Sequence, residues 1–166
     1  MLIRTAQGKH TRSPQFQHFR YFTVTLGADP SYETQEFYRP RLTDDSHRVN
    51  AMFSKAGAMG LHVEKRSLDK GELRRLVLRA DCLVVTLVDG RYLQYNGIVS
   101  SHVSTGGYVG HYVIICGWNE ATDEYLLSDP ACPGECYLDA AILETARKSY
   151  GTDEDLLVIQ TNSNEC

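Results

Sequence analysis

The chain has 166 residues, enough for one domain with a substantial buried core. Its apolar fraction of 42% and charged fraction of 23% are ordinary for a globular protein, and no apolar run approaches the roughly 20 residues of a membrane helix. The net charge of −4 argues against a nucleic-acid binder that relies on phosphate contacts. We therefore expect one globular domain with neither a membrane nor a nucleic acid as its partner.

The two ends of the chain differ in composition from its middle. The first residues are polar and lack the apolar stretch of a secretory signal. The sequence predicts an irregular segment at 1–18, a single domain at 19–160 and a flexible tail at 161–166.

Strand-like and helix-like segments follow one another in a mixed order. Aromatic and β-branched runs indicate strands, and apolar side chains three or four residues apart indicate helices. The strands are predicted at 19–26, 62–67, 81–88, 111–117, 124–128 and 156–160, and the helices at 43–59, 69–79 and 137–150. The strand at 81–88 is almost entirely apolar, so we expect it at the centre of the sheet. This order predicts an α+β fold with a mostly antiparallel central sheet and flanking helices.

Two of the predicted helices have clear end signals. The helix at 43–59 has an apolar face that includes Met52, Phe53 and Met59, and Gly60 suits the residue after a helix end. The helix at 69–79 begins with Asp69 and has Glu72 three residues later, the pattern of a capping box.

Five cysteines are present, and Cys82 and Cys116 lie in apolar runs typical of the core. Cys132 and Cys136 are separated by three residues and are interpreted as two thiols in a turn, the alternative being half of a metal site. An odd cysteine count without a secretory signal favours a reducing compartment, so we expect a cytoplasmic location.

Residues 91–108 form a long insertion of the kind that often has a function. The Gly-rich run at 104–110 has no Lys, which favours a flexible loop over a phosphate-binding one. Asp153, Glu154 and Asp155 are interpreted as a solvated acidic turn, the alternative being a cation site.

His111 and Asp129 flank a predicted hairpin. His111 opens one strand, Asp129 closes the next, and the turn Asn119–Asp123 lies between them. A hairpin brings its outer ends together, and a histidine oriented by an aspartate is a general-base arrangement. The alternative is a buried histidine whose hydrogen bond a neighbour satisfies.

Four segments together resemble one family: FTVTLGADP (22–30), GHYVIICG (110–117), SDPA (128–131) and ETARKSYGTDED (144–155). They resemble the plant soluble guanylyl-cyclase-like family, whose animal relatives are the guanylyl-cyclase-domain-containing proteins. The resemblance covers roughly residues 19–160. It implies a soluble enzyme that converts GTP to cyclic GMP and pyrophosphate with Mg²⁺ or Mn²⁺.

The same resemblance implies a papain-like fold of the bacteriocin-processing cysteine-peptidase type. In that pattern a Cys-His-Asp triad is completed by residues that fall on His111 and Asp129. No cysteine precedes Cys82 here, so we expect the architecture to be truncated at the N-terminus and to lack its nucleophile. The alternative function is therefore a non-catalytic binding or regulatory module that retains the His and Asp.

The short motif of plant cyclases places nucleotide contacts on the first strand and the residues after it. By resemblance, Arg20 or Tyr21 contacts guanine and Thr23 helps to select it. Glu33 or Glu36 holds the metal, and Arg39 or Arg41 offsets the charge of the phosphates. The alternative is that Phe22–Thr25 is simply a core strand.

Overall fold

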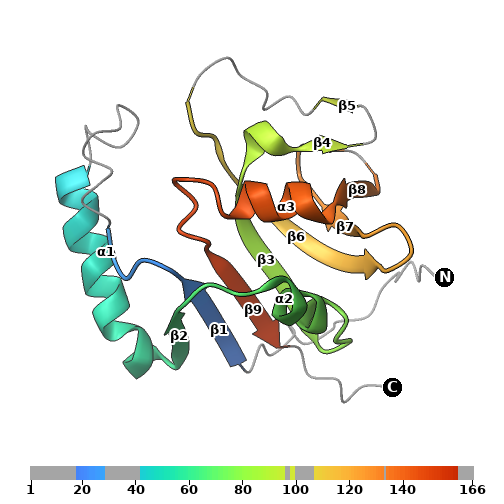
Figure 1. The fold of residues 1–166 in the computed structure, drawn as a ribbon. Helices are drawn as coiled ribbons and strands as arrows, with labels where there is room; N and C mark the ends of the chain where they lie inside the picture. The colour runs from blue at the N-terminus through green and yellow to red at the C-terminus, as the bar shows by residue number, and fades with distance from the viewer. Residues whose placement is uncertain (1–17, 29–41, 96–97, 100–106, 133, 161–166) are drawn as a thin grey trace, which may run out of the picture.

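The computed structural model describes residues 18–28, 42–95, 98–99, 107–132 and 134–160. They form an α+β fold built on one seven-stranded sheet with the order β2-β1-β9-β3-β6-β7-β8 (Figure 1). The strands of this sheet are β1 (His18–Thr23), β2 (Leu61–Lys65), β3 (Cys82–Asp89), β6 (Gly110–Asn119), β7 (Glu124–Ser128), β8 (Cys136–Asp139) and β9 (Leu156–Gln160). Only β1 and β2 pair in parallel, so the predicted mostly antiparallel sheet is confirmed.

In the described part of the chain, three α-helices accompany the sheet: α1 (Leu42–Ala56), α2 (Lys70–Val77) and α3 (Ala140–Arg147). Figure 1 shows α2 and α3 on the same face of the sheet, where both contact β3. The small hairpin of β4 (Gln94–Tyr95) and β5 (Ile98–Val99) follows a 3₁₀ turn, Gly90–Tyr92, and another 3₁₀ turn, Gly57–Met59, extends α1. Among the described residues, no helix is long and apolar enough to cross a membrane.

The core lies between the sheet and these two helices. It is formed by side chains that point to one face of each strand, and its largest apolar members include Phe22, Val84, Val113, Leu127 and Leu143. At 25 cal/mol per Å² of apolar surface, each fully buried side chain of this size contributes about 2 kcal/mol. β3 is the fourth of the seven strands, which confirms its predicted central position.

Several local predictions are confirmed. The Asp69 side chain accepts a hydrogen bond from the Glu72 backbone N–H, and the Glu72 carboxylate accepts one from the Asp69 backbone N–H, so the capping box is complete. Gly60 has a φ of 78°, the left-handed conformation expected after a helix end.

Other local predictions are wrong. The helix predicted at 137–150 begins only at Ala140, because Tyr125 and Leu127 pair with Leu138 and Cys136 and extend the sheet by one strand. On the first helix, Met52 and Met59 are 59% and 71% exposed, so its predicted apolar face is narrower than the pattern indicates.

The cysteine predictions also need correction. Cys116 is exposed because strand alternation places it on the face of β6 opposite the buried Val113 and Ile115, and the register with β7 shifts between Ile115 and Gly117. Cys82 is only partly buried against the core. Cys132 and Cys136 are joined in a disulfide rather than being two thiols in a turn. Their pairing follows from the turn after β7, in which the Cys132 N–H donates to the Asp129 carbonyl and so bends the chain back toward β8.

Candidate functional site

The predicted hairpin is present and brings His111 and Asp129 together. β6 and β7 pair in antiparallel register from Ile114–Ser128 to Asn119–Glu124, and Asp123 adopts a positive φ of 51° at the turn. His111 is the second residue of β6, and Asp129 directly follows β7. Both side chains lie on the face that packs against the helices. His111 is two residues from the buried Val113, and Asp129 is two residues from the buried Leu127, so each shares its neighbour's side of the sheet.

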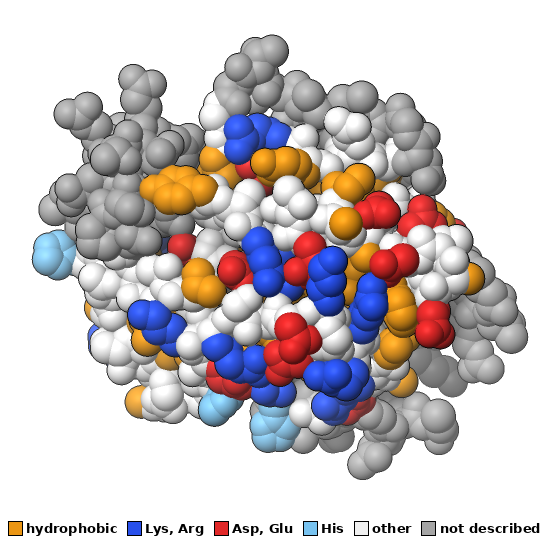
Figure 2. Space-filling view, viewed as in Figure 1, with side chains coloured by type: hydrophobic (Ala, Val, Ile, Leu, Met, Phe, Trp, Pro, Cys, Tyr) orange, Lys and Arg blue, Asp and Glu red, His pale blue; other side chains and the backbone are white. Residues whose placement is uncertain are grey.

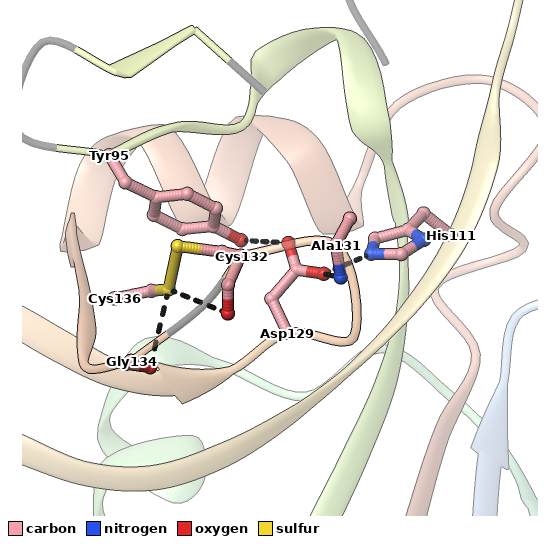
Figure 3. Close-up of a disulfide and its surroundings, with 7 residues drawn as sticks. All are labelled: Tyr95, His111, Asp129, Ala131, Cys132, Gly134 and Cys136. Carbon is pink, nitrogen blue, oxygen red and sulfur yellow. Dashed lines mark hydrogen bonds and ion pairs between the residues drawn. A yellow bond between two sulfur atoms is a disulfide. The ribbon is translucent and has the colours of Figure 1, made fainter. Parts of the chain in front are cut away.

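The two side chains are in direct contact. Nε2 of His111 lies 2.7 Å from Oδ1 of Asp129. Figure 3 shows the two side chains pointing toward each other. The Asp129 side chain is fully buried, whereas that of His111 is 14% exposed. Because Nε2 is hydrogen-bonded to Asp129, the ring would accept a proton from a substrate through its other nitrogen, Nδ1.

Asp129 has two further hydrogen-bond donors. The Tyr95 hydroxyl donates to Oδ2 at 2.6 Å, and the Ala131 backbone N–H donates to Oδ1 at 2.7 Å. Although burial raises the pKa of Asp129, the hydrogen bonds from Tyr95, Ala131 and His111 together hold it below its ordinary value. Asp129 is therefore an ionised carboxylate that fixes the orientation of the imidazole.

Tyr95 is a site residue that the sequence patterns do not identify. It belongs to β4, within the insertion expected to have a function, and it is 2% exposed. Nothing in its local sequence connects it to Asp129, which is 34 positions away. The Ala131 contact is different, because an Asp whose carboxylate accepts from the N–H two residues later is a common turn motif.

The disulfide lies beside this group. Figure 3 shows Cys132 and Cys136 on the Tyr95 side of Asp129, with His111 on the other side. Elsewhere in the described part of the chain, Cys82 contacts Asp81 and Cys116 contacts the Ile114 carbonyl. Each of these four sulfur atoms thus has a partner other than the imidazole.

The residues predicted to contact the nucleotide lie on opposite faces of β1. Arg20 points to the helix-covered face and donates to Glu64 at 2.7 Å. Tyr21 points the other way, where its ring lies 6.1 Å from that of Phe53 in α1. The Thr23 hydroxyl donates to the Thr25 carbonyl at 3.0 Å. Strand alternation therefore separates Arg20 from Tyr21 and Thr23.

The other predicted ligands are not part of the described structure. Glu33 and Glu36, predicted to hold the metal, and Arg39 and Arg41, predicted to offset phosphate charge, all lie outside the described residues. Within the described ranges, no three His, Cys, Asp or Glu side chains gather as a metal site requires.

The acidic turn at 153–155 is not simply solvated. The Glu154 carboxylate accepts a hydrogen bond from Ser67 and lies 3.8 Å from the Lys148 ammonium group. Asp155 is largely buried, and burial raises the pKa of its carboxyl to about 6. Its backbone carbonyl accepts from the Leu87 N–H, which ties the turn to β3. The turn thus connects α3 to the sheet through these contacts.

Comparison with known proteins identifies the family. A family model described as guanylylate cyclase matches residues 14–159, nearly the whole chain. The chain is also 39% identical over 147 residues to guanylyl cyclase 1 of Arabidopsis thaliana, a match that covers 85% of this chain and 54% of that protein. The chain therefore spans about half the length of this curated relative. On this evidence, the chain belongs to the guanylylate cyclase family.

Proposed function

We propose that the chain takes part in converting GTP to cyclic GMP and pyrophosphate, with His111 as the general base. The family match over residues 14–159 is the observation that supports this proposal most directly. The name of the Arabidopsis relative supports the same activity. The contact between His111 and Asp129 supplies the group that cyclisation needs first, a base held in a fixed orientation.

The proposed proton transfer uses only these residues. Nδ1 of His111 accepts the proton of the ribose 3′-hydroxyl, and the resulting oxygen forms a bond to the α-phosphorus. The bond from that phosphorus to the bridging oxygen breaks, and pyrophosphate leaves with the bonding electrons. Asp129 stabilises the imidazolium that forms, because its carboxylate stays ionised and hydrogen-bonded to Nε2.

Mg²⁺ or Mn²⁺ would supply charge neutralisation on the triphosphate, as it does for phosphoryl transfer in general. The described residues offer no cluster that fits such an ion, so Glu33 and Glu36 remain the predicted ligands and no step is assigned to the metal. A cytoplasmic location likewise remains a prediction from the sequence.

The test is cyclic GMP formation by the purified chain with GTP and Mn²⁺, measured by mass spectrometry. His111→Ala removes the base and is expected to reduce turnover at least a hundredfold, the usual contribution of general-base catalysis. His47→Ala changes an exposed histidine of α1 and is the matched control, expected to keep wild-type turnover. Equal turnover in wild type and His111→Ala would point to a contaminating host cyclase or another base, and would overturn the assignment.

A non-catalytic binding or regulatory module with a papain-like fold is the second candidate. It is supported by the same His–Asp contact together with the four described cysteines, whose partners are other groups. This candidate predicts that GTP is not turned over by wild type even when full-length relatives are active in the same assay. Turnover that depends on His111 would exclude it.

A further inference from the structure

A pocket on the helix-covered face lies apart from His111. It has a volume of about 420 Å³ and lies between β1 and α2. The residues that line it are Arg20, Phe22, Arg66, Leu68, Glu72, Arg75, Leu76 and Arg79. Four of these eight residues are arginines. Figure 2 shows Lys and Arg side chains interleaved with Asp and Glu on the face over α2 and the neighbouring strands.

Three of the arginines are held in place by hydrogen bonds to carboxylates. Arg20 donates to Glu64 through Nε and Nη2, so its Nη1 has no carboxylate partner among the described residues. Arg66 donates through Nε to Glu64 and through Nη1 to Glu72, so the nitrogen without such a partner is Nη2. Arg79 donates to Asp81 through Nε and Nη2, so here it is again Nη1. Each guanidinium is thus oriented while keeping one nitrogen with two N–H donors for a ligand.

A buried ring adds to this orientation. The guanidinium carbons of Arg20 and Arg66 each lie 4.9 Å from the ring centroid of Phe22, which is fully buried. Two cations on one fixed ring lose less conformational freedom when a ligand binds than two mobile surface arginines would.

The fourth arginine is not held by an ion pair. Arg75 is exposed on α2, and no carboxylate of the described residues lies within ion-pair distance of it. Three of the carboxylates around the pocket stay ionised. Burial raises the pKa of Glu64, but hydrogen bonds from Arg20 and Arg66 outweigh it, and hydrogen bonds from Arg66 and Arg79 lower the pKa values of Glu72 and Asp81. Asp69, which precedes α2, interacts electrostatically with Arg75, so four carboxylates offset the four arginines. An anion would therefore be bound here by oriented guanidinium N–H donors rather than by a net positive charge.

The pocket and the His111 group are two separate places on the sheet. Arg20 pairs with Val158, Val158 with Val84 and Val84 with Ile115, so three strand spacings separate β1 from β6. Ile115 is four residues from His111 along β6. With spacings of about 4.8 Å between strands and about 3.3 Å per residue, the separation is about 20 Å.

We propose that this pocket binds an oligophosphate group, either free pyrophosphate or the triphosphate of a nucleotide, at a site distinct from the His111–Asp129 pair. Guanidinium groups bind phosphate oxygens through paired N–H donors, and a volume of about 420 Å³ accommodates a ligand of this size. This inference goes beyond the proposed cyclase activity and does not depend on it.

The test is calorimetric titration of the wild-type chain with pyrophosphate, and separately with GTP, in metal-free buffer. Arg75→Ala removes the lining guanidinium that makes no ion pair with a described carboxylate, and it is expected to weaken binding about tenfold, the effect of losing one charged hydrogen-bonding group. Lys70→Ala removes one positive charge from an exposed position on the same helix and is expected to change the affinity less than twofold. Tighter binding of GTP identifies a nucleotide triphosphate as the ligand, and tighter binding of pyrophosphate identifies the free oligophosphate.

Three results would overturn the proposal: no binding of either probe to wild type, full affinity in Arg75→Ala, or equal losses in Arg75→Ala and Lys70→Ala. Equal losses would mean that the probes are attracted to positive charge in general and are not bound in the pocket. His111→Ala is expected to bind pyrophosphate as wild type does. The oligophosphate site and the cyclase activity can therefore fail independently.

Discussion

At the scale of single residues, the orientation of His111 depends on what surrounds Asp129. The buried carboxylate accepts three hydrogen bonds, from a phenol, a backbone N–H and the imidazole. A buried carboxylate with fewer donors is more costly to keep ionised. Tyr95 and Ala131 are therefore positioning groups for the histidine, although neither would touch a substrate through these contacts.

Tyr95→Phe tests this dependence. The variant removes one donor from Asp129 without changing the ring, so we expect the pKa of Asp129 to rise toward its ordinary value. Turnover is expected to fall several-fold, and the acidic side of its pH profile is expected to move to higher pH. Carboxyl titration by NMR and cyclic GMP formation as a function of pH are the measurements.

Tyr92→Phe is the matched control, because Tyr92 is 40% exposed and lies in the same insertion. It is expected to leave both the Asp129 titration and the pH profile unchanged. An Asp129 pKa that stays at its wild-type value in Tyr95→Phe would contradict the positioning role.

At the scale of secondary-structure elements, prediction succeeded where the signal was local. The capping box of α2, the left-handed Gly60 and the β6–β7 hairpin each depend on a few neighbouring residues, and all three are present. The prediction failed at 137–139, where pairing of β8 with β7 overrides the helical pattern. Strand pairing is a tertiary effect, and a single window of sequence does not contain it.

The capping box gives an element-scale prediction. Asp69→Ala removes the acceptor for the Glu72 N–H at the first turn of α2, and the loss of such a cap costs about 1 kcal/mol of unfolding free energy. Urea denaturation followed by circular dichroism measures the change. Lys70→Ala, one residue later and without a capping contact, is expected to change the unfolding free energy by less than half as much. Equal stability of Asp69→Ala and wild type would show that tertiary packing alone holds this helix end.

At the scale of the whole molecule, the α+β class and the central position of β3 could be predicted, because the apolar runs are long and their order is mixed. The His111–Asp129 contact could also be predicted, since both residues border one hairpin. Tyr95 and the arginine pocket could not, because they join positions far apart in the sequence. Arg20 and Arg66 meet only through the parallel pairing of β1 with β2, and the sequence does not specify that pairing.

Asp155 connects a single charge to the stability of the whole fold. It lies where the turn after α3 enters β9, and its Oδ1 is buried without a hydrogen-bond partner among the described residues. Burial raises its pKa from 3.8 to about 6. The native state therefore binds more protons than the unfolded state between these values, and stability falls as the pH rises through that window. Above about pH 6 the full free-energy cost of keeping the buried Asp155 ionised is present.

Asp155→Asn removes this charge and keeps an acceptor for the Tyr21 hydroxyl, which hydrogen-bonds to the carboxyl. We expect the variant to be more stable than wild type at pH 7.5, by at most about 3 kcal/mol for a pKa shift of about two units. As the pH falls to 3.5 the two proteins should converge, because Asp155 is then neutral in the native state and mostly neutral in the unfolded state. Glu120→Gln, in the exposed β6–β7 turn, should show no such pH-dependent gain. Urea denaturation from pH 3.5 to 8 measures all three proteins, and an Asn variant less stable than wild type at pH 7.5 would mean that the buried carboxylate stabilises the native fold.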